Sequence, residues 1–541
     1  MNPSFNKKSF TRMATFAFTL GAALAPGLVF SQSNAASSNK PGSPTNPVAS
    51  IELTLPEYLK RVEKGSPQIL IDRHDVNMSA ANFHETRDQF APTLSGSYNA
   101  NWNASQYTNA TTNQGYKLAV GKTFAETGTT LSLGTGGSFT SSPYSAPTTV
   151  AFGANSFTLS SPDPTKTSWN ANVNLTFVQS ILRGGPIGFM GWDTIRITRE
   201  QARLARSVYN SKTGGNLINA ISAYWTYELN QKLLKLQMDS ITDAQDLLAK
   251  NRQRVNVGLI DISDVYTSEV NLSSQINQRY QIERDLLKNR RDLILYMGIT
   301  NLPAGKADIV LKDSLKFQDI ELDEEKLIET AKKNRKELEQ AKIATEIARM
   351  ALRQARSALL PKLDFTLNAG MMGYDTNNGN LGDAYTSVFS NFKSGAKFVN
   401  FNAGLQFETP LDPTAYKTVV ERREEAYAQA LKKENLAKDQ IETDIRERVW
   451  NLQYLRGVLI RTSDALGLSE QKVAELRRQF NNSKIDTTQF NIGYESLRGT
   501  QRLYYATLVQ YEVEKAALLQ AQGIFLKTYG VGEITTTGWI K

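Results

Sequence analysis

The sequence predicts a mainly α-helical chain that also carries the strands of a transmembrane β-barrel, organised as two internal structural repeats. The first observation is a repetition: residues 94–100 are echoed by residues 363–369, and each run begins two residues after a proline, Pro92 or Pro361. The second is strict apolar/polar alternation in both copies, and the third is a very long helical pattern that follows each. A duplicated unit that mixes such strands with very long helices restricts the range of functions sharply.

The N-terminus has the features of an export signal. Lys7, Lys8 and Arg12 precede an apolar stretch at residues 13–30, and small residues follow it. We therefore expect a signal peptide over residues 1–35 and a flexible leader over residues 36–52. The chain contains no cysteine, which excludes disulfides and an N-terminal lipid-modified cysteine.

Four segments alternate as membrane strands do, near residues 94–102, 169–177, 363–371 and 399–407. One face of each is apolar, and the other is rich in asparagine, serine and threonine. This pattern is typical of barrel strands that face lipid on one side and a wet lumen on the other. The residues expected to face lipid are Leu175, Phe177, Phe365 and Phe401, and those expected to face the lumen are Asn172, Asn174, Asn368 and Asn402.

The long segment between the first two strands contains a further alternating pair. Residues 116–124 and 129–139 flank a turn at residues 126–128. This pair fits either an additional barrel hairpin or an extracellular elaboration, and the pattern does not decide between them. Residues 141–167, rich in serine, proline and threonine, are expected to form an exposed loop.

Two runs without proline, at residues 187–256 and 414–482, predict helices of about 100 Å at ~1.5 Å per residue. Apolar residues recur at three- and four-residue steps, as in a coiled-coil seam, and antiparallel partner helices are expected at residues 262–297 and 490–529. The first repeat then covers residues 53–300 and the second residues 336–531. An equatorial linker at residues 301–335 joins them, and a tail at residues 532–541 ends the chain.

Four strands per chain, or six with the extra hairpin, cannot close a membrane barrel, because the smallest have about eight. Open sheet edges in hydrocarbon leave backbone groups unpaired at a cost of several kcal/mol each. Several copies of the chain are therefore expected to close one barrel, and the long helices to continue it as a tube. The alternative from another class is a periplasmic coiled-coil adaptor or scaffold protein, which would share the helices but lack the strands.

The chain resembles TolC-type outer-membrane efflux and secretion proteins over residues 53–531. The most specific stretch is residues 254–265, RVNVGLIDISDV, and the junctions at residues 177–185 and 407–412 are also similar. The resemblance implies a homotrimer with a twelve-stranded barrel in outer-membrane lipid, an α-helical barrel in the periplasm and an equatorial belt. It further implies a passive channel of a tripartite efflux pump or type I secretion system. The implied partners are a periplasmic membrane-fusion adaptor and an inner-membrane transporter driven by protons or ATP.

The same resemblance places a gate near the helix tips. Asp264 matches the gate aspartate of the first repeat, although an acid in the first turn of a helix is also favoured by the helix dipole. The second repeat has Phe480 and Ile485 where the family often has tyrosine and arginine, and Gln489 and Ile492 at the positions of the acidic ring. Lys484 and Asp486 are charged neighbours that could substitute. The residues expected to contact the adaptor are Val257, Gly258, Leu259, Ile260, Asn482 and Ser483.

The sequence argues against an enzyme. The two histidines, His74 and His84, lie in a charged helical segment where a solvated face is the simpler interpretation, and no phosphate loop, nucleophile elbow or zinc spacing occurs. We expect no cofactor and no metal. The net charge of +9 is spread along helices that also carry acids, so nucleic-acid binding is not expected.

Overall fold

The computed structural model describes residues 51–105, 108–152, 155–188, 190–299, 309–375, 380–393 and 399–532. The predicted signal peptide, nearly all of the leader, part of the linker and all but the first residue of the tail lie outside these ranges. All helices and strands given below belong to the unit that begins at Ser50.

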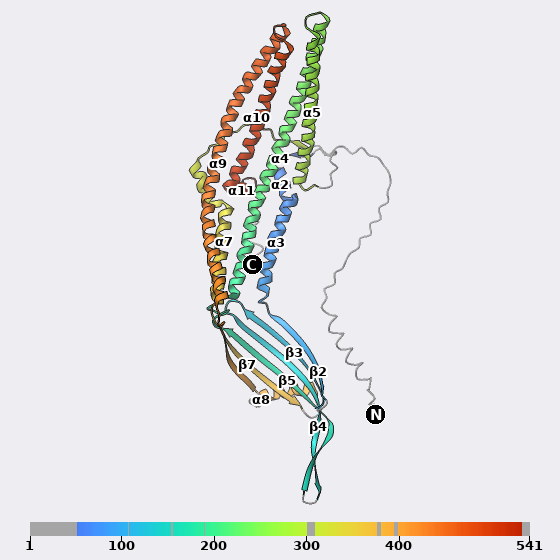
Figure 1. The fold of residues 1–541 in the computed structure, drawn as a ribbon, viewed down its shortest axis with the longest axis vertical. Coiled ribbons are helices and arrows are strands. Elements are labelled where there is room, and N and C mark those ends of the chain that lie inside the picture. The colour runs from blue at the N-terminus through green and yellow to red at the C-terminus, as the bar shows by residue number, and fades with distance from the viewer. Residues whose placement is uncertain are drawn as a thin grey trace, which may run out of the picture. The chain divides into compact units, whose positions relative to one another are not determined.

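One antiparallel sheet contains six strands in the order β2-β3-β4-β5-β7-β8. Their bounds are β2 Thr93–Ser105, β3 Thr108–Phe124, β4 Thr129–Phe152, β5 Asn155–Ser180, β7 Lys362–Asp375 and β8 Val399–Glu408. The segment 116–139 is therefore a hairpin of the same sheet (Figure 1).

The expected loop at residues 141–167 is wrong. β4 and β5 stay paired far beyond the rest of the sheet, from Thr129↔Gln179 to Phe152↔Asn155, with one irregularity between Ser142 and Tyr144. Serine and threonine suit a paired strand as well as a loop, and this ladder satisfies the backbone groups of the segment. Of the two strand counts that the sequence left open, four or six per chain, the described residues form six; the twelve-stranded trimer that the resemblance implies assumes four.

The register separates the two faces of the sheet. One row joins Leu94, Val120, Leu133, Leu175, Ala369 and Phe401. Directly paired residues of neighbouring strands share a face, so this row lies on one side, and Phe177 and Phe365 share its parity. Asn172, Asn174, Asn368 and Asn402 lie on the opposite face. Several side chains of the apolar row are open, with Leu94 at 77%, Leu133 at 57% and Phe401 at 69% exposure.

Helices carry the chain away from the sheet. They are α2 Leu55–Gly65, α3 Pro67–Asp88, α4 Met190–Asn256, α5 Ile262–Tyr296, α6 Glu324–Asn334, α7 Lys336–Ala358, α8 Leu381–Lys393, α9 Thr414–Asn481, α10 Thr487–Ala521 and α11 Phe525–Thr528. α4 and α5 form one antiparallel hairpin, and α9 and α10 form another (Figure 1). α3 packs on α4 and α7 on α9, whereas the short α8 covers part of β5 and β7.

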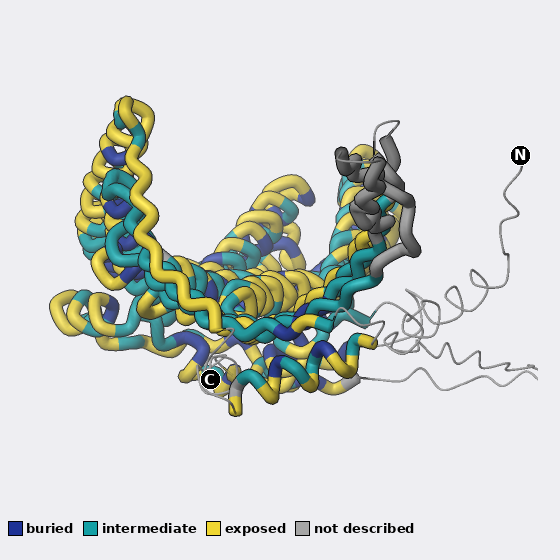
Figure 2. Tube along the Cα trace, turned by 90° about the horizontal axis from the view of Figure 1, so that it is seen from below, coloured by how far each residue is buried: buried dark blue, intermediate teal, exposed yellow. Residues whose placement is uncertain are grey.

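The main core lies around the middle of the long helices. β1 (Ile51–Leu53) pairs in parallel with β6 (Ile309–Leu311), and the Tyr224 hydroxyl of α4 contacts the Leu53 carbonyl (3.3 Å) and the Asp313 carboxylate (2.9 Å). Tyr58, Leu293, Tyr511 and Phe525 are buried in the same cluster, which therefore joins both hairpins. Buried and exposed stretches alternate along the helices, as amphipathic packing requires (Figure 2).

A charged pair fixes α7 against the start of α4. Asp193 is fully buried and accepts hydrogen bonds from the Arg353 guanidinium, one at 2.6 Å from Nε. Because both oxygens are bonded, the pair holds the orientation of the two helices as well as neutralising the charge. Among the described residues, no helix is both long enough and apolar enough to cross a membrane.

Candidate functional site: the tips of the helical hairpins

Each long helix ends in a turn of the same geometry. After α4, the Gly258 amide bonds to Val255 O (2.9 Å) and the Leu259 amide to Arg254 O (2.9 Å), with Gly258 at φ +73°. After α9, Ser483 takes the equivalent place at φ +58°, its amide bonded to Phe480 O (3.0 Å). A left-handed residue satisfies the last carbonyls of a helix, and glycine adopts it with least strain.

Each partner helix begins with an aspartate cap. Asp261 accepts a hydrogen bond from the Ser263 amide (2.9 Å), and Asp486 accepts one from the Gln489 amide (2.7 Å). The bond from Ser263 lowers the pKa of Asp261. The Asp486 carboxylate is thus engaged by its own helix, which accounts for an acid at this position without any gate.

The predicted gate aspartate stands apart from the other polar groups. Asp264 is half-buried in the first turn of α5, where its backbone carbonyl accepts from the Ser268 hydroxyl (2.9 Å). No ion pair or hydrogen bond to its carboxylate is found within the described part of the chain. Lys484, Asp486, Gln489 and Ile492 are all exposed, Ile492 at 64%.

The second tip packs against the first through its aromatic residues. Phe480 is buried at 3% exposure and stacks on Phe490 with ring centroids 5.0 Å apart. Leu247 of α4 is buried in the same cluster, and the half-buried Ile485 packs against it together with Leu476 and Tyr494. The Arg254 guanidinium lies 4.5 Å from the Phe480 ring centroid and donates to Phe480 O (2.8 Å) and Asn481 O (3.2 Å). One arginine of the first tip therefore holds the end of α9.

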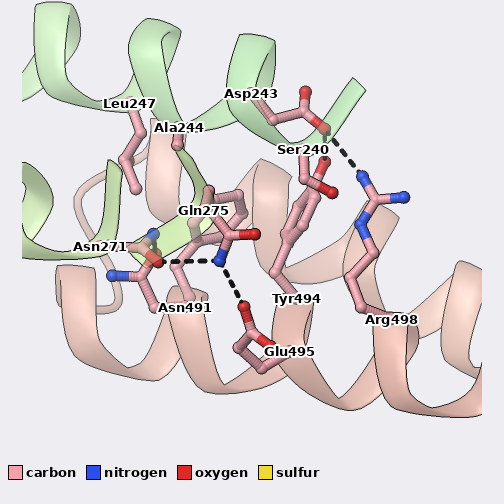
Figure 3. A pocket seen from close by; sticks show the side chains of 11 residues that line it. Ser240, Asp243, Ala244, Leu247, Asn271, Gln275, Asn491, Tyr494, Glu495 and Arg498 are labelled. Atoms are coloured by element: carbon pink, nitrogen blue, oxygen red, sulfur yellow. Dashed lines mark hydrogen bonds and ion pairs between the residues drawn. The ribbon is translucent and has the colours of Figure 1, made fainter. Parts of the chain in front are cut away.

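Between the tips and the sheet, amide side chains link the two hairpins. The Asn251 amide nitrogen donates to Ser268 Oγ (2.8 Å) on α5 and to Thr487 Oγ1 (2.9 Å) on α10. Farther from the tips, Asn271 donates to Asn491 (3.1 Å) and Gln275 to Glu495 (2.7 Å). The residues of these last two bonds line a small pocket between α4, α5 and α10 (Figure 3).

A charged cluster joins three of the long helices at the rim of this pocket. Asp243 on α4 accepts from the Arg477 guanidinium of α9 (2.8 Å) and from the Tyr494 hydroxyl of α10 (2.9 Å). Arg498 is buried and lies 3.6 Å from the same carboxylate (Figure 3). Burial, and then the bond to Asp243, raise the pKa of Tyr494, which stays a neutral donor. The cluster combines aspartate, tyrosine and arginine, the residue types expected of a polar gate.

The Asp243 cluster was not among the sites predicted from the sequence. A usable signal was present, because residues equally far from the turn of an antiparallel hairpin face each other. Arg477 and Tyr494 lie almost symmetrically about Ile485. The approach of Asp243 from the other hairpin carries no such signal, since it depends on how the two hairpins pack.

The two tips expose different surfaces. Val257 and Leu259 are 69% and 65% exposed at the first tip, beside Gly258 and the half-buried Ile260. At the second tip the exposed residues Asn482, Ser483 and Lys484 are polar. No cluster of histidine, cysteine or carboxylate side chains suited to a metal ion occurs within the described ranges.

Comparison with known proteins gives relatives in sequence and in fold. No family model matches the chain. Outer membrane protein TolC of Vibrio cholerae is 25% identical over 324 residues, which cover 58% of this chain and 68% of that protein. Outer membrane protein TolC of Escherichia coli is 23% identical over 255 residues, 44% of this chain and 47% of that protein, so the match spans about half of its length.

The Campylobacter jejuni CmeC outer membrane channel has the same fold, with a TM-score of 0.62 at 12% identity, over 95% of this chain and 96% of that one. The mainly helical chain with its sheet therefore matches the fold of TolC-like channels, and the resemblance to TolC-type proteins noted in the sequence is confirmed.

Proposed function

Because the chain resembles TolC-type proteins in sequence and in fold, we propose that it is an outer-membrane channel of a tripartite efflux pump or type I secretion system. The observation that carries this proposal is the sheet: one face exposes an apolar row that crosses all six strands, and the other carries asparagines. An exposed apolar surface of this extent needs lipid or protein to cover it. The asparagine face would line an aqueous path.

The proposed assembly is a homotrimer, anchored in outer-membrane lipid and extending into the periplasm after removal of a signal peptide. β2 and β8 each pair on one side only, so the sheet needs further copies to close. The long hairpins would then surround a passive conduit, which takes its cargo from a periplasmic adaptor and an inner-membrane transporter. It has no catalytic role.

We place the closure of this conduit on contacts between the two hairpins of a chain. Asp243 with Arg477 and Tyr494, and the apolar cluster of Phe480 and Phe490, would hold the hairpins together in the closed state. Asp264, whose carboxylate has no polar partner among the described residues, would contribute little within one chain. The exposed first tip, Val257 to Ile260, is the proposed contact for the adaptor.

A matched pair of variants on β5 tests the channel. Leu175→Arg and Asn174→Arg place the same charge at adjacent positions on opposite faces. At a lipid-facing site near the bilayer midplane, arginine costs about 2–4 kcal/mol, so Leu175→Arg should reduce trimer recovered from membranes, whereas Asn174→Arg should assemble and alter single-channel conductance. Native mass spectrometry in detergent and planar-bilayer recordings give the two readouts.

A stable detergent-free monomer without conductance, equally tolerant of both arginines, would exclude the channel. That result would favour the alternative of a periplasmic adaptor or scaffold.

A further inference from the structure

We infer that the β3–β4 hairpin is part of the barrel wall, so that three copies close a barrel of eighteen strands, with β2 of one copy paired to β8 of the next. This inference rests on the proposed channel and specifies its partner, a second copy of this chain, and the width of its exit. Four observations support it.

The first observation is that the hairpin is paired along its length on both sides. β3 pairs with β2 from Thr93↔Gly121 to Ser105↔Thr108, and β4 pairs with β5 from its first residue onward. A loop resting on the outside of a barrel would leave β2 and β5 to pair with each other. Here β3 and β4 separate them completely.

The second observation is that the turn between β3 and β4 reaches the end of the sheet from which the helices continue. Ser180 at the end of β5 donates to Gly128 O (3.5 Å), and the Gln179 amide donates to Thr127 O (2.8 Å). Gly128 has φ +67°, and a Cβ there would come within 2.1 Å of Gly184 O in the segment before α4. The turn is therefore built into the junction between strands and helices, and β3 and β4 cross the same layer as the other strands.

The third observation is that the hairpin continues both faces. Leu118, Val120, Leu131 and Leu133 share the apolar face with Leu175, and their side chains are 48%, 51%, 41% and 57% exposed. Neighbouring residues on the asparagine face, among them Ala119, Gly121, Ser132 and Gly134, are small. An extracellular elaboration would not need an apolar face in register with the membrane strands.

The fourth observation is that the two sheet edges are compatible. All neighbours in the sheet are antiparallel and the number of strands is even, so β2 and β8 run in opposite directions. β8 of one copy can therefore pair antiparallel with β2 of another, with the apolar faces on the same side. Six strands cannot close alone, since the smallest membrane barrels have about eight.

Closure with eighteen strands fixes the size of the exit. Strands about 4.8 Å apart and tilted by about 40° give a backbone diameter of about 36 Å for eighteen strands, compared with about 24 Å for twelve. Barrels of 16–18 strands leave an open aqueous channel. The outer-membrane part is thus a wide exit, and restriction of the path falls to the helical tips.

Introduced disulfides test the strand order, because the chain has no native cysteine. Leu94→Cys with Val120→Cys joins directly paired residues of β2 and β3, and should form a bond within one chain on oxidation. Leu94→Cys with Leu175→Cys serves as the matched control. β2 and β5 lie about 14 Å apart when two strands separate them, beyond the ~7 Å limit between the Cα atoms of a disulfide.

Closure is tested by Leu94→Cys combined in turn with cysteine at Phe401, Ala403, Leu405 and Phe407. Several β8 positions are needed because barrel shear offsets the register at closure. We expect at least one pair to give covalent dimers and trimers on denaturing gels, and end-on cryo-electron microscopy to show the wider barrel.

A disulfide between the cysteines introduced at positions 94 and 175, found in a trimer that still conducts, would overturn the inference but not the proposed channel function. A bond between β2 and β8 within a single chain would overturn it as well. If the wild-type protein, which has no cysteine, forms no oligomer and shows no conductance, the proposed function itself is contradicted.

Discussion

The two hairpin tips share a backbone geometry and differ in what they do with their apolar residues. At the first tip Val257 and Leu259 are exposed to solvent, whereas at the second Phe480 is buried and the exposed residues Asn482 and Ser483 are polar. The left-handed position holds Gly258 in one and Ser483 in the other. This difference supports the proposal that the first tip contacts a partner protein, whereas the second tip holds the two hairpins of the chain together.

The largest expected effect comes from removing the buried ring of the second tip. Phe480→Ala deletes the stack on Phe490 and the contact with Arg254, and buried Phe→Ala changes cost about 3–5 kcal/mol. Hydrogen exchange of amides at the ends of α9 and α10 should accelerate by about a hundredfold or more. The exposed Val257→Ala is the control, with an expected cost below about 0.5 kcal/mol. Equal effects at both sites would remove the proposed distinction between the tips.

A smaller loss of stability is expected when Arg254, which links the two tips, is removed. Arg254→Ala removes two charge-assisted bonds to carbonyls and a cation–π contact, for which about 1–2 kcal/mol is expected at this partly exposed site. Arg252→Ala breaks only the exposed pair with Glu269, worth about 0.2–1 kcal/mol. Hydrogen exchange of the backbone amides near Phe480 should distinguish the two variants. If these amides exchange as slowly in Arg254→Ala as in the wild type, the second tip is stable without its contact to the first.

Substitutions at the two left-handed turn residues, Gly258 and Ser483, should change the stability of their turns in opposite directions. Gly258→Ala forces a Cβ into the left-handed region and should destabilise the first tip by about 1 kcal/mol, although nothing lies within 4 Å of the new atom. Ser483→Gly relieves the same strain and should stabilise the second tip by about 0.5 kcal/mol. Limited proteolysis at the two turns would measure both changes. If both variants change the stability of their turns in the same direction, the two left-handed positions are not under the same backbone strain.

The smallest effect is expected at the aspartate that the family resemblance singled out. Asp264→Ala should change closed-state conductance little, because its carboxylate has no polar partner within the described chain. Asp243→Ala should raise conductance more, since it releases Arg477 and Tyr494 together. Planar-bilayer recordings at matched salt compare the two. A larger effect at Asp264 would reveal a partner in a neighbouring subunit.

Sequence periodicity predicted the long helices closely, because seventy residues without proline and with a regular apolar stripe leave few alternatives to a helix. α9 was expected at residues 414–482 and spans Thr414–Asn481. The distal parts of β4 and β5 were missed, because a Ser/Pro/Thr-rich composition does not distinguish a paired strand from a loop. The Asp243 cluster was missed for a different reason: it depends on which faces of three helices meet, and local pattern does not encode that.

The position of Asn251 limits how the hairpins can move. Its amide is fully buried and bonds simultaneously to Ser268 and Thr487, which fixes α4, α5 and α10 at one height. A slide along the helix axes by even one residue, ~1.5 Å, would break both bonds of this fully buried side chain, whereas a rotation about it lengthens neither. Any opening motion that preserves these bonds is therefore a rotation of the hairpins about a point near the tip. The displacement of each helix residue then grows with its distance from Asn251.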